Sequence, residues 1–163
     1  MANKYRVFIS GTNTEVGKTH ITKNLIKLSK NNKLSVAPYK PIETGCKQVG
    51  SILMPSDAQL FYKLTNGKIA LDDINPYRFK NPISPNRAIK LSQRKIYLKN
   101  FVKKASCFDN FDLLIVEGAG GLCSPIALDG LNIDLIKKMK LATILVAKDE
   151  IGVINNVLMS LNI

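Results

Sequence analysis

The stretch that decides the fold is Gly11-Thr12-Asn13-Thr14-Glu15-Val16-Gly17-Lys18-Thr19. It follows a short apolar run over residues 5–10 and leads into an amphipathic run that begins near Lys18. Strand, glycine-bounded loop and helix in this order are typical of a phosphate-binding loop, whose backbone N–H groups and helix N-terminus bind phosphate oxygens. In such a loop, Lys18 reaches the β- and γ-phosphates and the Thr19 hydroxyl binds Mg²⁺.

The spacing of this loop differs from the usual G-x-x-x-x-G-K-[ST] pattern. Thr12 stands at the position of the first glycine, and Gly11 lies one residue earlier. The structural alternative is an ordinary glycine-containing turn between a strand and a helix, followed by a surface lysine. The Gly17-Lys18-Thr19 triplet falls at the expected helix start, which favours the phosphate loop.

Length and charge limit the classes of protein to consider. The 163 residues suffice for one domain with a substantial core. The net charge of +12 comes mostly from lysines spread along the chain. Solvated faces and attraction of a polyphosphate explain this charge equally well, so we expect no nucleic-acid partner.

The cysteines and the apolar runs bear on the compartment. Cys46, Cys107 and Cys123 lack metal-ligand spacing and are odd in number, as expected of reduced thiols in a cytoplasmic protein. No apolar run approaches the roughly 20 residues of a membrane span, so no membrane partner is expected. The single histidine, His20, has no second ligand near it in the sequence and is expected to be a surface or packing residue.

The order of patterns along the chain predicts the fold class. Ile21, Leu25 and Leu28 recur at helical spacing, and residues 35–39 then read as a strand. A strand, helix, strand order implies a right-handed crossover and a parallel sheet. We therefore expect an α/β fold, a three-layer P-loop NTPase-like architecture with a mostly parallel central sheet. Its further elements are a buried strand at 112–117, a strand at 142–147, and helices at 132–140 and from 152 onward.

Three other segments carry weaker signals. Residues 56–59 have the pattern of a helix capping box with Ser56 at its start, and spacing alone makes Asp57 a first-turn acid that complements the helix dipole. Residues 79–87 contain two prolines and predict an irregular connection. Residues 97, 101, 105 and 108 form a helical apolar stripe that is expected in the core.

Two charged residues stand where parallel strands end. Lys40 follows the expected strand at 35–39, on the edge of the sheet where the phosphate loop also opens. Glu117 ends the clearest buried strand, at the usual position of the second Mg²⁺ anchor in P-loop proteins. Residues 118–121 read Gly-Ala-Gly-Gly, which lets the backbone approach a ligand closely. The alternative for this segment is a polar strand end and a flexible turn.

Several motifs together resemble the dethiobiotin synthetase family, over nearly the whole chain and in order. They are Gly11 to Thr19, Lys40-Pro41-Ile42-Glu43-Thr44-Gly45, Ser56-Asp57-Ala58, Val116 to Gly121, and Gly152-Val153-Ile154-Asn155. The resemblance implies an ATP-dependent ligase of biotin biosynthesis that closes the ureido ring of dethiobiotin from 7,8-diaminononanoate and CO₂. The implied route runs through a carbamate and a carbamic–phosphoric anhydride.

The resemblance also implies roles for individual residues. Lys40 and Lys18 are the catalytic residues, and Thr19, Asp57 and Glu117 hold Mg²⁺, which reverses the interpretation of Asp57 from spacing alone. ATP is expected to bind to Thr14, Glu15, Val16, Gly17, Lys18, Thr19 and Glu117. The substrate is expected to bind to Thr14, Lys40, Thr44, Gly118, Ala119, Gly120, Gly121, Gly152, Val153 and Asn155. The last three positions match a segment that receives the substrate's tail carboxylate across a homodimer interface, so sites at the interface are expected.

Three features depart from the family pattern. Asn13 replaces the usual aspartate of the phosphate loop, a polar change that we expect to be tolerated, and Asn86 replaces a histidine common after Ser84-Pro85. The sequence stops inside an expected helix, whereas family members continue for some tens of residues. Residues 1–163 are therefore expected to form a single P-loop ligase domain, shortened at its C-terminus.

Two alternatives remain open from the sequence. One is a partition-type regulatory P-loop ATPase, although such a loop normally carries a lysine near its start, where this chain has Thr12, Asn13 and Thr14. The other is an inactive fragment of the ligase fold, because the short C-terminus lacks strands and adenine-binding segments of the family.

Overall fold

The fold is built on a four-stranded parallel sheet. A computed structural model of the chain describes residues 4–163. The strand order in the sheet is β2-β7-β1-β8, and every neighbouring pair is parallel. The bounds of these strands are β1 (Tyr5–Gly11), β2 (Val36–Tyr39), β7 (Leu113–Gly121) and β8 (Ala142–Val146). The predicted α/β class and P-loop NTPase-like arrangement are confirmed.

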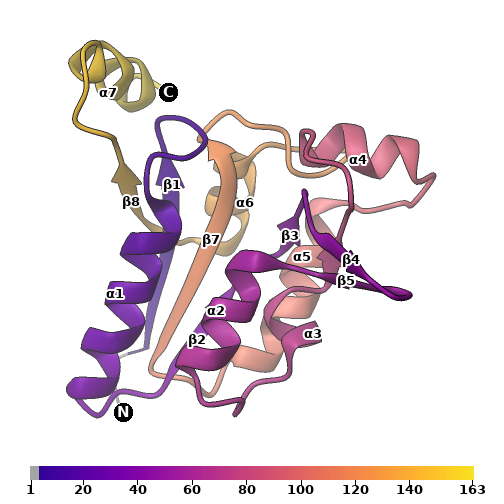
Figure 1. Cartoon of the computed structure of the whole chain (residues 1–163). Helices are drawn as coiled ribbons and strands as arrows, with labels where there is room; N and C mark the ends of the chain where they lie inside the picture. Colours follow the sequence, from indigo (N-terminus) through magenta and orange to yellow (C-terminus); the bar gives the residue numbers. More distant parts are fainter. Residues whose placement is uncertain (1–3) are drawn as a thin grey trace.

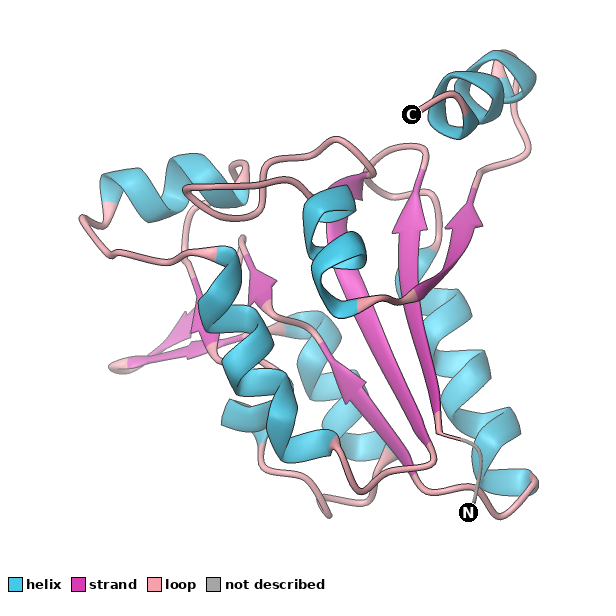
Figure 2. Cartoon of the chain, turned by 180° about the vertical axis from the view of Figure 1, so that it is seen from behind, coloured by secondary structure: helices cyan, strands magenta, loops and turns pink. Residues whose placement is uncertain are grey.

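Helices cover both faces of this sheet (Figures 1 and 2). Helix α1 (Lys18–Asn31) packs on one face, against β1, β2 and β7. Helices α5 (Leu98–Ala105) and α6 (Asn132–Met139) lie on the other face and contact each other. The three layers that the sequence predicts are thus helix, sheet and helix.

The remaining elements lie outside the four-stranded sheet. They are α2 (Ser56–Leu64), α3 (Leu71–Ile74), α4 (Pro85–Leu91), α7 (Val153–Leu161) and the 3₁₀ turn η1 (Ser106–Phe108). A two-stranded parallel sheet joins β3 (Ile42–Glu43) to β6 (Tyr77–Arg78), and an antiparallel hairpin joins β4 (Lys47–Val49) to β5 (Ile52–Met54). Figure 1 shows α7 standing apart from the sheet beyond β8. Among residues 4–163, no helix combines the length and the apolar character needed to span a bilayer.

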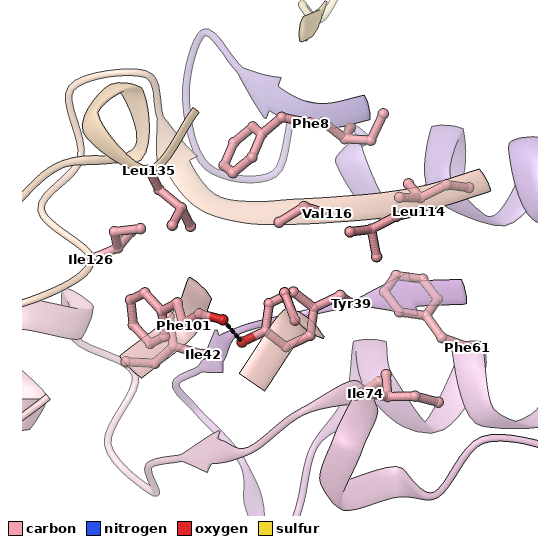
Figure 3. Packing of buried hydrophobic residues seen from close by; sticks show 14 of the residues in the cluster. Phe8, Tyr39, Ile42, Phe61, Ile74, Phe101, Leu114, Val116, Ile126 and Leu135 are labelled. Carbon is pink, nitrogen blue, oxygen red and sulfur yellow. Dashed lines mark hydrogen bonds between the residues drawn. The ribbon is translucent and has the colours of Figure 1, made fainter. Parts of the chain in front are cut away.

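The core fills the space between the sheet and its helices (Figure 3). Phe8 and Val116 of the central strands are fully buried, as is Phe61 of α2. The Tyr39 hydroxyl is buried with them and donates a hydrogen bond of 3.0 Å to the carbonyl oxygen of Phe101. Tyr39 therefore contributes its ring to the core without leaving its hydroxyl unpaired, which would be costly.

The buried face of α1 only partly follows the apolar spacing in the sequence. Leu28 is 58% exposed, whereas Ile26 is fully buried. The buried positions of α1 are Lys18, Thr22, Ile26 and Ser29, a stripe that includes three polar residues. The apolar stripe packs against the core at Ile21 and Leu25 but not at Leu28. The buried face also carries polar groups, because Thr22 donates a hydrogen bond to Glu117 in the cleft described below.

Two boundaries also differ from prediction. Strand β7 does not end at Glu117. It continues to Gly121, with a register shift against β1 between the pairs Ile9–Glu117 and Gly11–Gly121. Helix α4 begins at Pro85, inside the segment expected to be irregular. Proline suits the first position of a helix because its missing N–H has no partner there.

Packing of Phe101 yields a test of the core. The ring is fully buried and lies edge-to-face with Tyr77, 5.6 Å between centroids. We expect Phe101→Ala to lower the free energy of unfolding by about 3–5 kcal/mol, because it leaves a cavity. Leu91→Ala, at a side chain 63% exposed, should cost less than about 0.5 kcal/mol. The chain has no tryptophan, so circular dichroism in urea is the appropriate measurement. Equal losses in the two variants would contradict this packing.

Candidate active site

The candidate site is a cleft of about 700 Å³ at the carboxyl edge of the sheet. Strand β1 ends in the phosphate loop, β2 is followed at once by Lys40, and β7 places Glu117 opposite Ile9 of β1. Ligands of parallel α/β sheets bind at this edge. The residues that line the cleft are Thr14, Glu15, Gly17, Lys18, Thr19, Lys40, Ile42, Glu43, Thr44, Asp57, Pro82, Ile83, Ser84, Pro85, Glu117, Ala119, Gly120, Ser124 and Pro125.

The phosphate loop is tightly closed around its own backbone. A Cβ atom at Gly11 would lie 2.6 Å from Val16 Cγ2 and 2.8 Å from the carbonyl oxygen of Asn13, so only glycine fits there. Gly17 has φ of 102° and forms the N-cap of α1, a conformation that glycine adopts without strain. The unusual spacing of the motif thus places its first glycine where the loop has no room for a side chain.

Lys18 lies within this loop. Its Nζ donates a hydrogen bond of 2.8 Å to the carbonyl oxygen of Asn13, and the side chain is buried. Burial, with the charge of Lys40 nearby, lowers the pKa of Lys18. The Asn13 side-chain oxygen accepts from the Thr14 N–H at 2.8 Å, a bond that an aspartate could also make. This contact agrees with the expectation that asparagine is tolerated at position 13.

Lys40 is the centre of the charged cluster in the cleft. Its ammonium is buried and donates to Asp57 Oδ2 at 2.8 Å and to Glu117 Oε1 at 2.6 Å. Burial alone would lower the pKa of Lys40, but the carboxylates of Glu117 and Asp57 outweigh it and raise this pKa well above the usual range. The main chain is fixed as well, because Asn75 Nδ2 donates to the Lys40 carbonyl oxygen at 2.6 Å. Lys40 therefore stays charged and joins two acids from different elements.

Glu117 is fully paired at this point. It accepts from Thr19 Oγ1 at 3.0 Å, from Thr22 Oγ1, and from Lys40. The sequence patterns assign no role to Thr22. Its position three residues after Thr19, on the same face of a helix, is the signal that would have found it.

The oxygen atoms around Lys40 fit a hard divalent cation. Asp57 and Glu117 lie within reach of one ammonium, and the Thr19 hydroxyl contacts Glu117. Among residues 4–163, no cluster of three or more His, Cys, Asp or Glu forms a complete metal site. A small number of protein ligands is sufficient for Mg²⁺, because it keeps several waters and is bound by one or two carboxylates together with substrate phosphates. The residues present therefore fit the predicted magnesium site.

Helix α2, which carries Asp57, does not begin as predicted. The capping box starting at Ser56 is absent, because Ser56 lies within the helix and Pro55 is the N-cap. The Glu43 carboxylate takes this role from another segment. It accepts from the N–H groups of Asp57 at 3.0 Å and Ala58 at 3.2 Å, and from Ser56 Oγ at 3.1 Å. The sequence motif that contains Glu43 predicts no role for this residue. A helix cap supplied by a distant segment leaves no pattern near the start of the helix.

The segment at residues 118–121 forms the floor of the cleft on the β7 side. Ala119 and Gly120 line the cleft, whereas Gly118, Gly121 and Val16 do not. Asn132, which the sequence did not single out, donates from Nδ2 to the carbonyl oxygens of Ala119 at 2.8 Å and Gly121 at 2.7 Å. This buried amide holds the segment in its irregular path.

Two predicted features lie away from the cluster. Gly152, Val153 and Asn155 are at the start of α7, outside the cleft lining, and no residue of α7 is buried. Asn86, at the position of the usual histidine, donates from Nδ2 to the Ala127 carbonyl oxygen at 2.6 Å. That bond ties α4 to the segment that follows β7.

Acid sensitivity follows from the pairing of Asp57. Burial would raise its pKa, but Lys40 outweighs this and holds the pKa below 3.8. A carboxyl with a lowered folded-state pKa stabilises the protein above its unfolded pKa and loses that stabilisation as pH falls. We expect the difference in unfolding free energy between wild type and Asp57→Asn to be constant above about pH 5 and to shrink below about pH 4. Urea unfolding in metal-free buffer checks this, and a difference that grows on acidification would contradict the ion pair.

Comparison with known proteins agrees with this geometry. Residues 5–163 match the model of an AAA domain family. Relatives named ATP-dependent dethiobiotin synthetase BioD occur in Ruthia magnifica, 39% identical over 96% of this chain and 71% of the relative, and in Vesicomyosocius okutanii, 42% identical over 96% and 70%. A third, from Methanocaldococcus jannaschii, is 35% identical over 94% of this chain and 71% of the relative.

These similarities extend across the phosphate loop, the Lys40 segment and β7, the parts of the chain that form the cleft. The chain spans about 70% of the length of these relatives. With the fold and the cleft in place, the comparisons show that the chain belongs to the family of ATP-dependent dethiobiotin synthetases, ligases built on a P-loop fold.

Proposed function

We propose that this chain closes the ureido ring of dethiobiotin from 7,8-diaminononanoate and CO₂, with cleavage of ATP to ADP and phosphate. The observation that carries the proposal is the position of Lys40. Its ammonium lies between two acids at the sheet edge where the phosphate loop and Lys18 also lie. The cleft thus gathers cations and metal-binding oxygens where an ATP triphosphate and an anionic co-substrate have to meet.

The reaction has three steps. An amine of the diamine adds to CO₂ and loses a proton, which gives a carbamate. A carbamate oxygen attacks the γ-phosphorus and the bond to ADP breaks, which gives a carbamic–phosphoric anhydride. The second amine attacks the anhydride carbon, and phosphate leaves as the ring closes. No group of the protein becomes covalently attached, so catalysis consists of positioning and electrostatic stabilisation.

Two lysines can reduce the charge repulsion in the second step, the attack of the carbamate on the γ-phosphate. A carbamate and a terminal phosphate are both anions, and they repel each other as they approach. Lys18 in the phosphate loop and Lys40 beside it can neutralise both groups, and Lys40 carries its charge at every pH near neutrality because Glu117 and Asp57 raise its pKa. Preorganised charges of this kind stabilise a transition state strongly where the bound substrates exclude water.

The proposed metal site consists of Thr19, Asp57 and Glu117. When bound, Mg²⁺ supplies positive charge to the phosphate oxygens. The protein contributes the orientation of these ligands. Thr22 and Thr19 hold Glu117 by hydrogen bonds, and the Glu43 cap fixes the main chain at Asp57.

The proposed diamine site lies in the same cleft as the phosphate loop, beside Lys40. Thr14, Thr44 and the 118–121 segment are the predicted contacts for its polar end. Ile42, Pro82 and Ile83 add apolar lining, which suits a substrate whose body is a methylene chain.

We also propose a homodimer in which Gly152, Val153 and Asn155 receive the substrate's carboxylate from the partner subunit. Gly152 is the N-cap of α7, and no residue of that helix is buried within this chain. A helix N-terminus favours a carboxylate. Figure 1 shows α7 apart from the sheet, and none of its residues lines the cleft, which supports a role of α7 in a neighbouring copy.

The activity is tested directly. Protein incubated with 7,8-diaminononanoate, bicarbonate and MgATP should form dethiobiotin, ADP and phosphate in equal amounts, followed by mass spectrometry and a phosphate assay. Omission of the diamine should reduce ATP hydrolysis to background. ATP hydrolysis that the diamine does not stimulate at saturation would contradict the proposal.

The role of Lys40 is tested by substitution. Lys40→Ala should lower kcat by at least about a hundredfold, the scale of losing one transition-state contact. Lys27→Ala, an exposed lysine on α1, should leave turnover unchanged. Circular dichroism would verify that both variants are folded. Near-normal turnover of Lys40→Ala would remove Lys40 from the reaction.

A further inference from the structure

We propose that Glu43 is a positioning residue that holds Asp57 in place for metal binding. This inference rests on the proposed function, in which Asp57 binds the metal. It assigns to Glu43 a task beyond stabilising a helix, and it is carried by three hydrogen bonds and by the location of Glu43 in the chain.

The contacts of Glu43 all converge on the first turn of α2. Oε1 accepts from the Asp57 N–H at 3.0 Å and from Ser56 Oγ at 3.1 Å, and Oε2 accepts from the Ala58 N–H at 3.2 Å. Glu43 is 5% exposed. The N-cap of α2 is Pro55, whose side chain makes no capping bond. Glu43 therefore supplies the side-chain cap to these first-turn N–H groups.

One short segment holds Asp57 by both its main chain and its side chain. Lys40 donates to Asp57 Oδ2 at 2.8 Å, and Glu43, three residues later, accepts from the Asp57 N–H at 3.0 Å. The main chain of Glu43 is itself fixed, because β3 pairs with β6 and the Phe79 N–H donates to the Glu43 carbonyl oxygen at 2.9 Å. The position of Asp57 is thus set by the segment that also carries Lys40.

The contact of Asp57 with Lys40 and its contact with Glu43 differ in whether they persist during the proposed reaction. Lys40 has to interact with the phosphoryl and carbamate oxygens, and each such contact competes with its bond to Asp57. The bonds from Glu43 to the N–H groups of Asp57 and Ala58 involve neither Lys40 nor the Asp57 carboxylate. The hydrogen bonds from Glu43 therefore keep Asp57 oriented when Lys40 contacts the substrate instead.

A cap that only stabilises α2 would behave differently from a positioning residue. It would lower the melting temperature on removal and leave metal affinity unchanged. Asp112 provides a matched control, because its carboxylate also accepts from a backbone N–H and a serine hydroxyl, both of Ser35, at 2.8 and 2.6 Å. Asp112 comes just before β7, at the amino-terminal end of the strand, whereas the cleft lies at the carboxyl end.

The first experiment measures binding of Mn²⁺ in the presence of ATP by electron paramagnetic resonance. Glu43→Gln keeps the size of the side chain but places an amide where the carboxylate accepts. We expect its Kd for Mn²⁺ to rise about tenfold or more, as for other residues that orient a metal ligand. Asp112→Asn should bind Mn²⁺ as wild type does, even where its melting temperature falls. Unchanged Mn²⁺ affinity in Glu43→Gln would overturn the inference.

The second experiment needs no ligand. Melting temperatures of wild type, Glu43→Gln, Asp57→Asn and the double variant form a cycle. If Glu43 positions Asp57 against Lys40, the two losses are not additive, whereas Asp112→Asn and Asp57→Asn should add, being distant. Additive losses in both cycles would contradict the positioning role.

The two experiments separate this inference from the function on which it rests. Wild-type protein that bound no Mn²⁺ with ATP would contradict the proposed function, and with it the metal role of Glu43. Wild-type binding together with unaffected binding by Glu43→Gln would contradict the inference alone.

Discussion

The structure of the cleft depends on one buried ammonium. Lys40 lies between Asp57 and Glu117, with Nζ 2.8 Å and 2.6 Å from their oxygens. Two carboxylates held this close in a buried site repel each other, and loss of the cation between them would leave an uncompensated charge. Neighbouring elements hold the two charged partners in place. Helix α1 brings hydroxyl groups to Glu117, and Asn75 fixes the main chain of Lys40.

This arrangement gives the proposed chemistry its logic. The two acids and the ammonium together carry one negative charge beside a phosphate loop that holds a second lysine. The metal and the triphosphate of the proposed reaction bring opposite charges to the cluster, so the carboxylates gain a new cation as Lys40 gains new anions. The same residues that neutralise one another in the ligand-free protein can therefore neutralise substrates, with little movement of the main chain.

The features that the sequence predicts correctly are those that depend on short local patterns. The phosphate loop, the strand leading to Glu117 and the position of Lys40 follow from short patterns, and the structure brings residues 40, 57 and 117 together. Patterns within one segment could not show the Glu43 cap, since its partners lie thirteen to fifteen residues away. Nor could they show that Lys18 and Thr22 of α1 are buried while Leu28 is exposed. The extension of β7 beyond Glu117 depends on pairing with β1 and on the amide of Asn132, both of which are tertiary.

The most direct test of the account is a crystal structure with 7,8-diaminononanoate, Mn²⁺ and a nonhydrolysable ATP analogue, in which anomalous scattering locates the metal. We expect one metal ion bound by oxygens of Asp57 and Glu117 at about 2.1 Å, the distance typical of such ligands, with Lys40 Nζ against the γ-phosphate. A Lys40 side chain that remained between the two acids, with the metal bound elsewhere, would contradict it.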